Sequence, residues 1–334
     1  MQSGLEKSKN PSKENIARFD YSALRTLIFG AIAASFGGIF IRLSEESLSP
    51  GATIFNRFFI ASLILISIRM PLIRAGFKHG VIKTFNSKVQ DTKTVLLFLL
   101  CGLAGALMQF AYGLSVARAG IAISTLLMNM TPLITGFFAW YFLKEKLSAL
   151  FGIGLSIAIG GAIGIALGEA NRQAAAPLGE MLALSSAFFY ATYLLLIQRL
   201  RERFSAIDIL TISCIVISIF MFFGVLISGQ QLFPVTLNGW LAVAMLAVIS
   251  QIIGQGSIII ALEKLSAKLA SVLLLLDPVF AAIFALMLFA EALTLSSWFG
   301  LVVCVIGISM CTLSQSRSSK RTFEPTDRNR NDCD

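Results

Sequence analysis

Two charged residues lie inside long apolar segments, where charges are scarce. Asp277 lies about eleven residues into the apolar stretch 266–289, and Arg57 a little over one helical turn into 52–70. A charge deep in an apolar helix is costly and usually faces a cavity or a partner. Such a carboxylate can take up a proton or bind a cation, and such a guanidinium can bind an anionic group. The alternatives are an Asp277 satisfied by a neighbouring helix and an Arg57 that reaches the external surface or pairs with Asp277.

Neutral polar residues add hydrogen-bonding capacity to the same segments. Gln109 and Tyr112 are three residues apart, and Gln251 and Gln255 are four apart, so each pair shares one face of a helix. Amides form hydrogen bonds without the cost of burying a charge, which suits a polar metabolite. The alternative role is hydrogen bonding between helices. Three further side chains are candidates for the wall of the same cavity, although packing explains the tyrosines equally well: Asn129, Tyr190 and Tyr193.

Two prolines interrupt these apolar segments. A proline lacks the backbone N–H, so it frees the carbonyl four residues earlier and can kink the helix. Pro278 directly follows Asp277 and frees the carbonyl of Leu274, and Pro132 follows Thr131 in an earlier segment. We therefore predict helix kinks at Pro132 and Pro278, the second of them beside the candidate carboxylate.

The elements that must position these residues are membrane-spanning helices. The chain of 334 residues is 56% hydrophobic and 13% charged, against about 25% charged in soluble domains. About 20 mostly apolar residues span a bilayer. An all-α membrane protein with ten such segments is predicted, with the third and fourth divided at Ala117 and Arg118: 24–41, 52–70, 95–115, 119–142, 149–167, 178–198, 207–228, 237–262, 266–289 and 295–314.

The basic residues orient these ten segments. Of the 27 Lys and Arg, 23 fall on one side, three (Arg42, Arg118 and Arg172) fall on the other, and Arg57 lies within a span. Lys and Arg accumulate in cytoplasmic loops. The split predicts that both polar tails, 1–22 and 315–334, are cytoplasmic and that the protein lies in a cell inner membrane. Because the basic residues lie between spans, the net charge of +9 does not indicate nucleic-acid binding.

Residues typical of catalytic and metal centres are scarce. The five cysteines have no CxxC spacing, and His79 is the single histidine. We therefore expect no catalytic centre, disulfide, metal site or cofactor. The phosphate-binding pattern GxxxxGK[ST] is also absent, so ATP is not the expected direct energy source. The spacing of the glycines predicts no particular oligomeric state.

The second half of the chain repeats the first. With a shift of 146 positions Pro132 falls on Pro278, Glu145 on Glu291 and Gln109 on Gln255. The repeat predicts two five-helix units, 23–167 and 178–314, called here the first and second halves. Since five is odd, the halves have opposite topology, an arrangement found in secondary transporters with a substrate site near the midplane. Asp277 falls opposite Thr131, so the halves differ chemically at this point.

Three segments carry a resemblance to a known family. Pro132 with FLKEKLS (142–148), and DPVFAAIFALMLFAEALT (277–294), resemble the paired P…E-x-L pattern of the EamA family, within the drug/metabolite transporter superfamily. The segment NRFFIAS (56–62) resembles that family's second helix. The resemblance covers residues 24–314. It implies a fold of five plus five helices around a central cavity, and transport, often export, of amino acids, related metabolites or drugs.

The expected function is therefore secondary transport of a small polar metabolite by alternating access, with protons as a candidate coupling ion. A cavity with one Arg and one Asp would suit a zwitterion such as an amino acid. A flippase for lipids or polyprenyl carriers on the same fold is the main alternative. A membrane-embedded transferase is disfavoured, because the histidines and carboxylate clusters of such enzymes are lacking.

Overall fold

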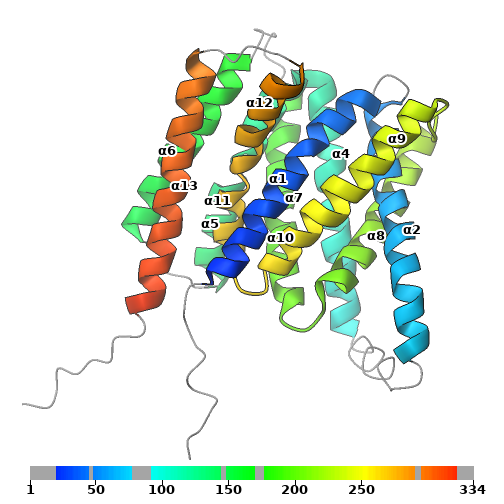
Figure 1. The fold of residues 1–334 in the computed structure, drawn as a ribbon, viewed down its shortest axis with the longest axis horizontal. Coiled ribbons are helices and arrows are strands. Elements are labelled where there is room, and N and C mark those ends of the chain that lie inside the picture. Colours follow the sequence, from blue (N-terminus) through cyan, green and yellow to red (C-terminus); the bar gives the residue numbers. More distant parts are fainter. Residues whose placement is uncertain are drawn as a thin grey trace, which may run out of the picture.

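The computed structural model describes residues 20–44, 48–76, 92–143, 148–169, 177–289 and 295–321. His79, Glu145, Glu291, Arg172 and Cys333 lie outside these ranges, as does most of both tails. Within the described ranges all regular secondary structure is helical (Figure 1). The helices are α1 (Tyr21–Ser44), α2 (Pro50–Gly76), α4 (Thr92–Met128), α5 (Thr131–Leu143), α6 (Ala149–Glu169), α7 (Pro177–Arg201), α8 (Ala206–Ile227), α9 (Leu237–Met245), the π-helix η1 (Leu246–Gln255), α10 (Gly256–Ala261), α11 (Ala267–Leu273), α12 (Leu276–Phe289) and α13 (Leu295–Arg321).

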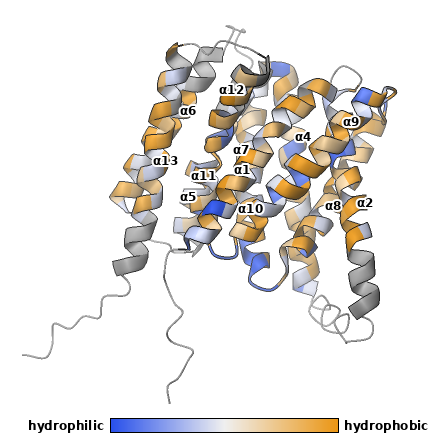
Figure 2. Ribbon diagram, viewed as in Figure 1, coloured by the Kyte–Doolittle hydropathy of each residue, from blue (hydrophilic) through white to orange (hydrophobic). Residues whose placement is uncertain are grey.

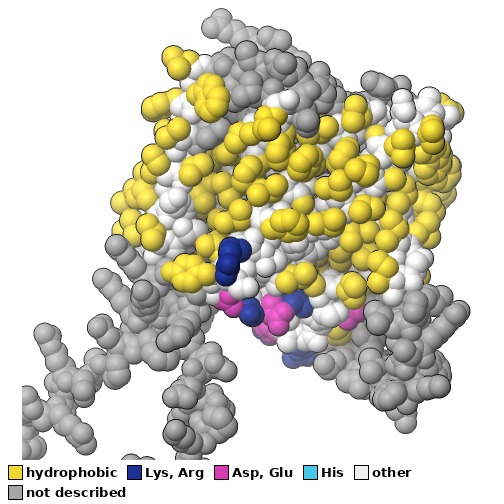
Figure 3. All heavy atoms as spheres, viewed as in Figure 1, with side chains coloured by type: hydrophobic (Ala, Val, Ile, Leu, Met, Phe, Trp, Pro, Cys, Tyr) yellow, Lys and Arg dark blue, Asp and Glu magenta, His cyan; other side chains and the backbone are white. Residues whose placement is uncertain are grey.

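Six stretches of helix in the described part are long and apolar enough to cross a membrane. They lie in α1, α2, α4, α7, α8 and the continuous run of α9, η1 and α10, and α6 and α13 carry shorter apolar stretches. Figure 2 shows hydrophobic residues along most of these helices, with hydrophilic residues at the turn after α10. In Figure 3 hydrophobic side chains cover the visible face and charged ones gather along its lower edge. An all-helical membrane protein is thus confirmed, and ten spans remain a prediction.

Helix α4 differs from the prediction. The expected break at Ala117 and Arg118 is wrong for the backbone, which stays helical through Met128. Nevertheless, the Ser115 and Ser124 hydroxyl oxygens lie 2.6 Å apart, although nine residues would separate them by about 13.5 Å along a straight helix. The Tyr112 and Thr125 hydroxyls, thirteen residues apart, lie 3.0 Å from each other. The helix axis therefore doubles back around Arg118–Gly120, where the sequence analysis had divided two spans.

The helical backbone is interrupted just before each of the two prolines. α4 ends at Met128 and α5 begins at Thr131; α11 ends at Leu273 and α12 begins at Leu276. The Met128 carbonyl, four residues before Pro132, accepts a hydrogen bond of 2.6 Å from the Thr131 hydroxyl. The Leu274 carbonyl, four residues before Pro278, accepts one of 3.0 Å from the backbone N–H of Asp277. At equivalent breaks in the two halves, the freed carbonyl groups thus accept hydrogen bonds from different donors.

Helices α6 and α13, the last of each half, pack through glycines. A β-carbon at Gly161 would lie 2.6 Å from the Gly300 carbonyl oxygen, and one at Gly307 would lie 2.6 Å from the Gly154 carbonyl oxygen. These four glycines are partners under the shift of 146 residues. Because the higher-numbered glycine of each helix meets the lower-numbered one of the other, the two helices run antiparallel. The contact looks the same from either helix, as expected for halves of opposite direction.

In the remaining contacts, too, each helix packs against a helix of the other half, and its counterpart does the same. α1 packs against α9, η1 and α10, and its counterpart α7 packs against α4. α2 packs against its own counterpart α8. In Figure 1, α6 and α13 stand at one end of the bundle and α2 and α8 at the other, with α1, α7 and the broken helices between them.

We expect the α6–α13 contact to tolerate no added side chain at Gly161. Gly161→Ala should destabilise the purified protein by about 1–3 kcal/mol, because the new methyl group overlaps the backbone of Cys304. Gly160→Ala is the matched control, since nothing lies within 4 Å of a β-carbon there. Thermal unfolding in detergent would compare the two, and equal melting temperatures would contradict the described packing.

The reversal within α4 can be tested by cross-linking. Ser115→Cys combined with Ser124→Cys should form a disulfide on mild oxidation, because the two hydroxyl oxygens are 2.6 Å apart. Peptide mass spectrometry would detect the link, and the two single variants would control for links to native cysteines. A straight α4 would leave the double variant unlinked.

Candidate functional site

Asp277 lies where α12 begins, among several other predicted site residues. It occupies the first turn of α12, just after the break that precedes Pro278. Protein surrounds the carboxylate densely, yet the side chain has substantial solvent-accessible surface, while neighbouring Leu275 and Val279 are buried. Its Oδ1 accepts a hydrogen bond of 2.5 Å from the hydroxyl of Ser35, a buried residue of α1. The carboxylate beside the break in the second half is thus joined to α1 of the first half.

Arg57 of α2 is held on one edge only. Its Nε donates to Oε1 of Gln251 at 3.0 Å, and its Nη2 donates to the hydroxyl of Ser250 at 3.2 Å. Its guanidinium carbon lies 5.4 Å from the ring centre of buried Phe58, a cation–π contact. Among the described residues Gln251 and Ser250 are its hydrogen-bond partners. The Nη1 edge therefore keeps its donors available for an anionic group.

Arg57 and Asp277 act electrostatically on one another without direct contact. The field of each reaches the other, and both reach the Tyr190 hydroxyl. No ion pair within 4 Å joins them in the described part of the chain. Tyr190 and Tyr193 lie beside them on α7 with their rings stacked, 6.4 Å apart at 20°. The structure therefore brings Arg57, Asp277 and the two tyrosines near one another from three places in the sequence, α2, α7 and α12.

Two adjacent residues of α1 connect the two charged groups. Ser250, which accepts from Arg57, donates to the backbone carbonyl of Ala34 at 3.2 Å. Ser35, the next residue, donates to Asp277. A displacement of α1 would thus disturb both charges together. Sequence reasoning missed Ser35 and Ser250, because a serine in an apolar helix usually bonds to its own backbone and gives no signal of direction.

The π-helix η1 places consecutive residues on one guanidinium. Ser250 and Gln251 both donate or accept at Arg57 or beside it, and η1 ends at Gln255, so the predicted residues Gln251 and Gln255 and the additional residue Ser250 all lie in this rare form of helix. π-Helices occur mostly as short segments and often at functional sites. α1 approaches η1 closely: a β-carbon at Gly37 would lie 2.8 Å from the Ser250 hydroxyl, and one at Gly254 2.8 Å from the Ala34 nitrogen. No sequence signal marks this segment as a π-helix.

Comparison with known proteins identifies the chain. The model of the EamA-like transporter family matches residues 22–167 and again 177–313, one copy in each half. The chain belongs to the EamA-like transporter family. The resemblance seen in the sequence is thereby confirmed, and the protein is an integral, multi-pass membrane protein of this transporter family.

One curated protein and one solved structure are similar to this EamA-like protein. The uncharacterized transporter YetK of Bacillus subtilis (strain 168) is 31% identical over 159 residues, which is 46% of this chain and 45% of YetK. The aligned part thus spans less than half the length of that relative. A solved crystal structure superposes with a TM-score of 0.73 over 88% of this chain and 98% of that one, at 18% identity. At this identity the likeness establishes the fold alone.

The other predicted site residues of this EamA-like protein have mixed surroundings. Tyr112 meets Thr125 at the bend of α4, and Gln109, one turn earlier, is half-buried with no hydrogen bond to Arg57 or Asp277 in the described structure. The side-chain nitrogens of Asn129 and Gln255 are buried and have no partner among the described residues. Such donors are costly to leave unpaired, and a ligand would satisfy them. The described residues contain no cluster of His, Cys, Asp or Glu suited to a metal ion.

Gln251 should be required to hold Arg57. Gln251→Leu would leave the Nε donor without its acceptor, at a cost of about 1–3 kcal/mol in the free energy of unfolding. Gln251→Glu keeps an acceptor oxygen and should be the milder change. Thermal unfolding of both variants would measure the difference, and a Gln251→Leu protein as stable as the parent would rule out this role.

Proposed function

We propose that this EamA-like protein is a secondary transporter that exports a small zwitterionic metabolite, such as an amino acid or a related compound. The observation that carries the proposal is the pair of Arg57 and Asp277. The two opposite charges act on each other without forming a direct ion pair, which would leave both able to meet a ligand. Two opposite charges held apart within a membrane-spanning bundle are costly, and a ligand with one charge of each sign would compensate both.

The two groups would divide the recognition of this ligand. The substrate carboxylate binds the open Nη1 edge of Arg57, whose planar fork matches the geometry of a carboxylate. The substrate ammonium group lies toward Asp277, with the ring of Tyr190 beside it. The unpaired amide nitrogens of Asn129 and Gln255 are further donors for a polar ligand. This division is supported by the donors and acceptors that the protein itself leaves unused.

The transmembrane arrangement that we propose has ten spans in two inverted halves. α4 supplies a limb on each side of its bend, and the second limb continues through the Pro132 break into α5. α9, η1 and α10 form one span, and α11 and α12 form another. The basic residues in the loops would place both termini in the cytoplasm and the protein in the inner membrane.

The proposed cycle is alternating access, in which the two halves rock around the bound substrate. Asp277 is the candidate group for a coupled proton, since it can exchange one with the cavity and its partner Ser35 belongs to the other half. Protonation would weaken that hydrogen bond, because a neutral carboxyl group accepts less strongly than a carboxylate. A proton on Asp277 would thus loosen a contact between the halves.

Efflux from proteoliposomes tests the proposal. Vesicles loaded with an equimolar mixture of the proteinogenic amino acids should release one or a few of them faster than protein-free vesicles, as measured by mass spectrometry. Arg57→Gln should lower this efflux about tenfold or more, since a hydrogen bond to a charged group is worth about 1.5–3 kcal/mol. Asp277→Asn should abolish any dependence of the efflux on an applied pH gradient.

Arg118→Gln is the matched control for Arg57→Gln, because Arg118 lies at the exposed bend of α4, away from the cavity. Its efflux should equal that of the parent protein. If no amino acid leaves faster than from protein-free vesicles, the zwitterion proposal is wrong. A pH response that survives Asp277→Asn would remove only the assignment of the proton to this residue.

A further inference from the structure

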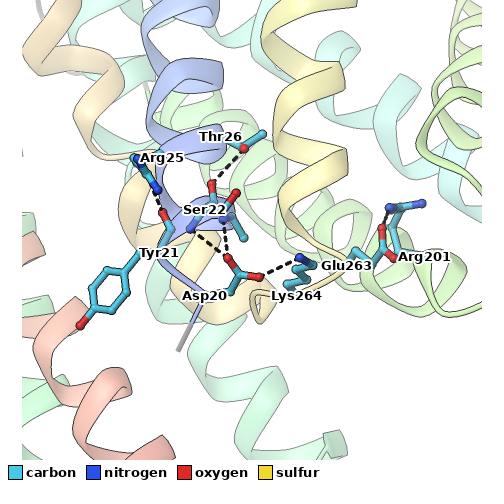
Figure 4. A network of polar contacts seen from close by, with 9 residues as sticks. Asp20, Tyr21, Ser22, Arg25, Thr26, Arg201, Glu263 and Lys264 are labelled. Carbon is cyan, nitrogen blue, oxygen red and sulfur yellow. Dashed lines mark hydrogen bonds and ion pairs between the residues drawn. The ribbon is translucent and has the colours of Figure 1, made fainter. Parts of the chain in front are cut away.

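The turn between α10 and α11 carries two adjacent residues of opposite charge, each held by a different helix (Figure 4). Lys264 donates from Nζ to Oδ2 of Asp20 at 2.8 Å, just before α1 begins. Glu263 forms an ion pair with Arg201 near the end of α7. Two ion pairs therefore hold the turn, one on each side, at the end of the bundle where α1 begins.

The contact with α7 lies within the second half of the chain and is firmly built. The Arg201 side chain is only 7% exposed and also donates to the Phe204 carbonyl at 2.7 Å. Nearby, Oε1 of Gln198 accepts a hydrogen bond of 2.7 Å from the backbone N–H of Ala267, the first residue of α11. These contacts fix the turn to its own half.

The contact with Asp20 crosses between the halves and lies in water. The Lys264 side chain is 58% exposed and that of Asp20 is 28% exposed. Oδ1 of Asp20 caps α1 by accepting from the backbone N–H groups of Ser22 and Ala23, which leaves Oδ2 for Lys264. One carboxylate thus serves α1 and the turn of the opposite half together.

We propose that the Asp20–Lys264 ion pair is a latch that keeps this end of the transporter closed and breaks when the end opens. It rests on the proposed alternating-access function, in which the halves move apart at each end in turn. Exposed ion pairs are weak, so the latch would shift the balance between closed and open states by roughly two- to fivefold. A shift of this size would favour the closed state without preventing the open state from forming.

At the opposite end of the bundle the corresponding contacts are of another kind. Under the shift of 146 residues Lys264 corresponds to Arg118, which donates to the Leu114 carbonyl of its own helix. There the α4 bend is joined to the start of α7 by the buried Ser115 hydroxyl, which donates to the Gly179 carbonyl at 2.8 Å. A β-carbon at Gly179 would lie 2.7 Å from that of Ala119. A higher salt concentration should therefore weaken the contact at the Lys264 end and leave the uncharged contacts at the Gly179 end unchanged.

Charge screening, and not pH near neutrality, should control the latch. The hydrogen bond from Lys264 lowers the pKa of Asp20 from its ordinary value of 3.8, and that same bond raises the pKa of Lys264 from 10.5, with Glu263 adding to the effect. The contribution of Asp20 is lost only as pH falls through its lowered pKa, and that of Lys264 only as pH rises through its raised pKa. Both groups stay charged from pH 6 to 8, whereas the screening length falls from about 10 Å at 0.1 M salt to 3 Å at 1 M.

Four substitutions isolate the ion pair. Asp20→Asn removes the charge and keeps a good N-cap residue for α1. Lys264→Gln removes the other charge, Lys264→Arg keeps it, and the double variant Asp20→Asn with Lys264→Gln closes a double-mutant cycle. Glu202→Gln is the matched control, because it breaks an exposed ion pair with Arg199 that lies within one half of the chain.

Amide hydrogen exchange on the full-length protein in lipid nanodiscs at pH 7 and 0.1 M salt provides the measurement. Asp20→Asn, Lys264→Gln and the double variant should each speed exchange two- to fivefold, and by the same factor. The faster exchange should include α11, which is buried (Ala267–Leu273), and not only the first turn of α1. Lys264→Arg and Glu202→Gln should match the parent, and 1 M salt should bring the parent to the rate of the charge-neutral variants.

Peptides around Gly179 should keep their exchange rate in all these variants. Changes confined to the first turn of α1 would mean simple fraying and would overturn the latch, as would additive effects in the double variant. The measurement uses no substrate. A failure of amino-acid efflux would therefore leave the latch standing, and an unresponsive α11 would reject the latch while leaving the efflux proposal intact.

Discussion

Every backbone polar group of this protein must find a partner without water, because lipid tails offer none. An unbroken helix meets this requirement by itself, so each departure from regular helix has to be compensated locally. At one proline the Thr131 hydroxyl satisfies the freed carbonyl of Met128; at the other, the N–H of Asp277 satisfies Leu274. The second solution uses the backbone of Asp277 and leaves its side chain to accept the hydrogen bond from Ser35. The same requirement that governs the fold thus places the carboxylate where chemistry can use it.

Glycines determine how near the two halves come to each other. Gly154, Gly161, Gly300 and Gly307 let α6 and α13 approach to backbone contact. Gly30, Gly37 and Gly254 do the same for α1 against the segment from η1 to α10. The second contact brings Ser250 to the Ala34 carbonyl and so sets where Arg57 is held. Small residues are commonly found at such helix contacts in membranes, where packing takes the place of a hydrophobic driving force.

The sequence was sufficient for features that depend on composition and spacing. Apolar length predicted the helices, and the shift of 146 residues predicted the equivalence of Gly161 and Gly307 as well as that of the two prolines. Features that depend on exact helix geometry were not predictable. The bend of α4 lies within a segment that remains helical from Thr92 to Met128, so its direction depends on packing as well as on local sequence. The π-helix of Ser250 and Gln251 depends on its packing against α1, and the Ser35 contact joins residues 242 positions apart. The residues near these positions in the sequence indicate neither the π-helix nor the Ser35 contact.

The antiparallel contact of α6 and α13 would limit how the halves can move in the proposed cycle. Helices whose backbones touch through interlocking glycines cannot slide along each other without collision, so rotation about the line of contact is the movement left to them. The displacement of any part of the molecule then grows with its distance from that line, as it does along a lever arm. α2 and α8, at the far end of the bundle in Figure 1, would travel furthest. Arg57, carried by α2, would be displaced more than a residue beside α6, so a small rotation at the glycines becomes a large change at the guanidinium.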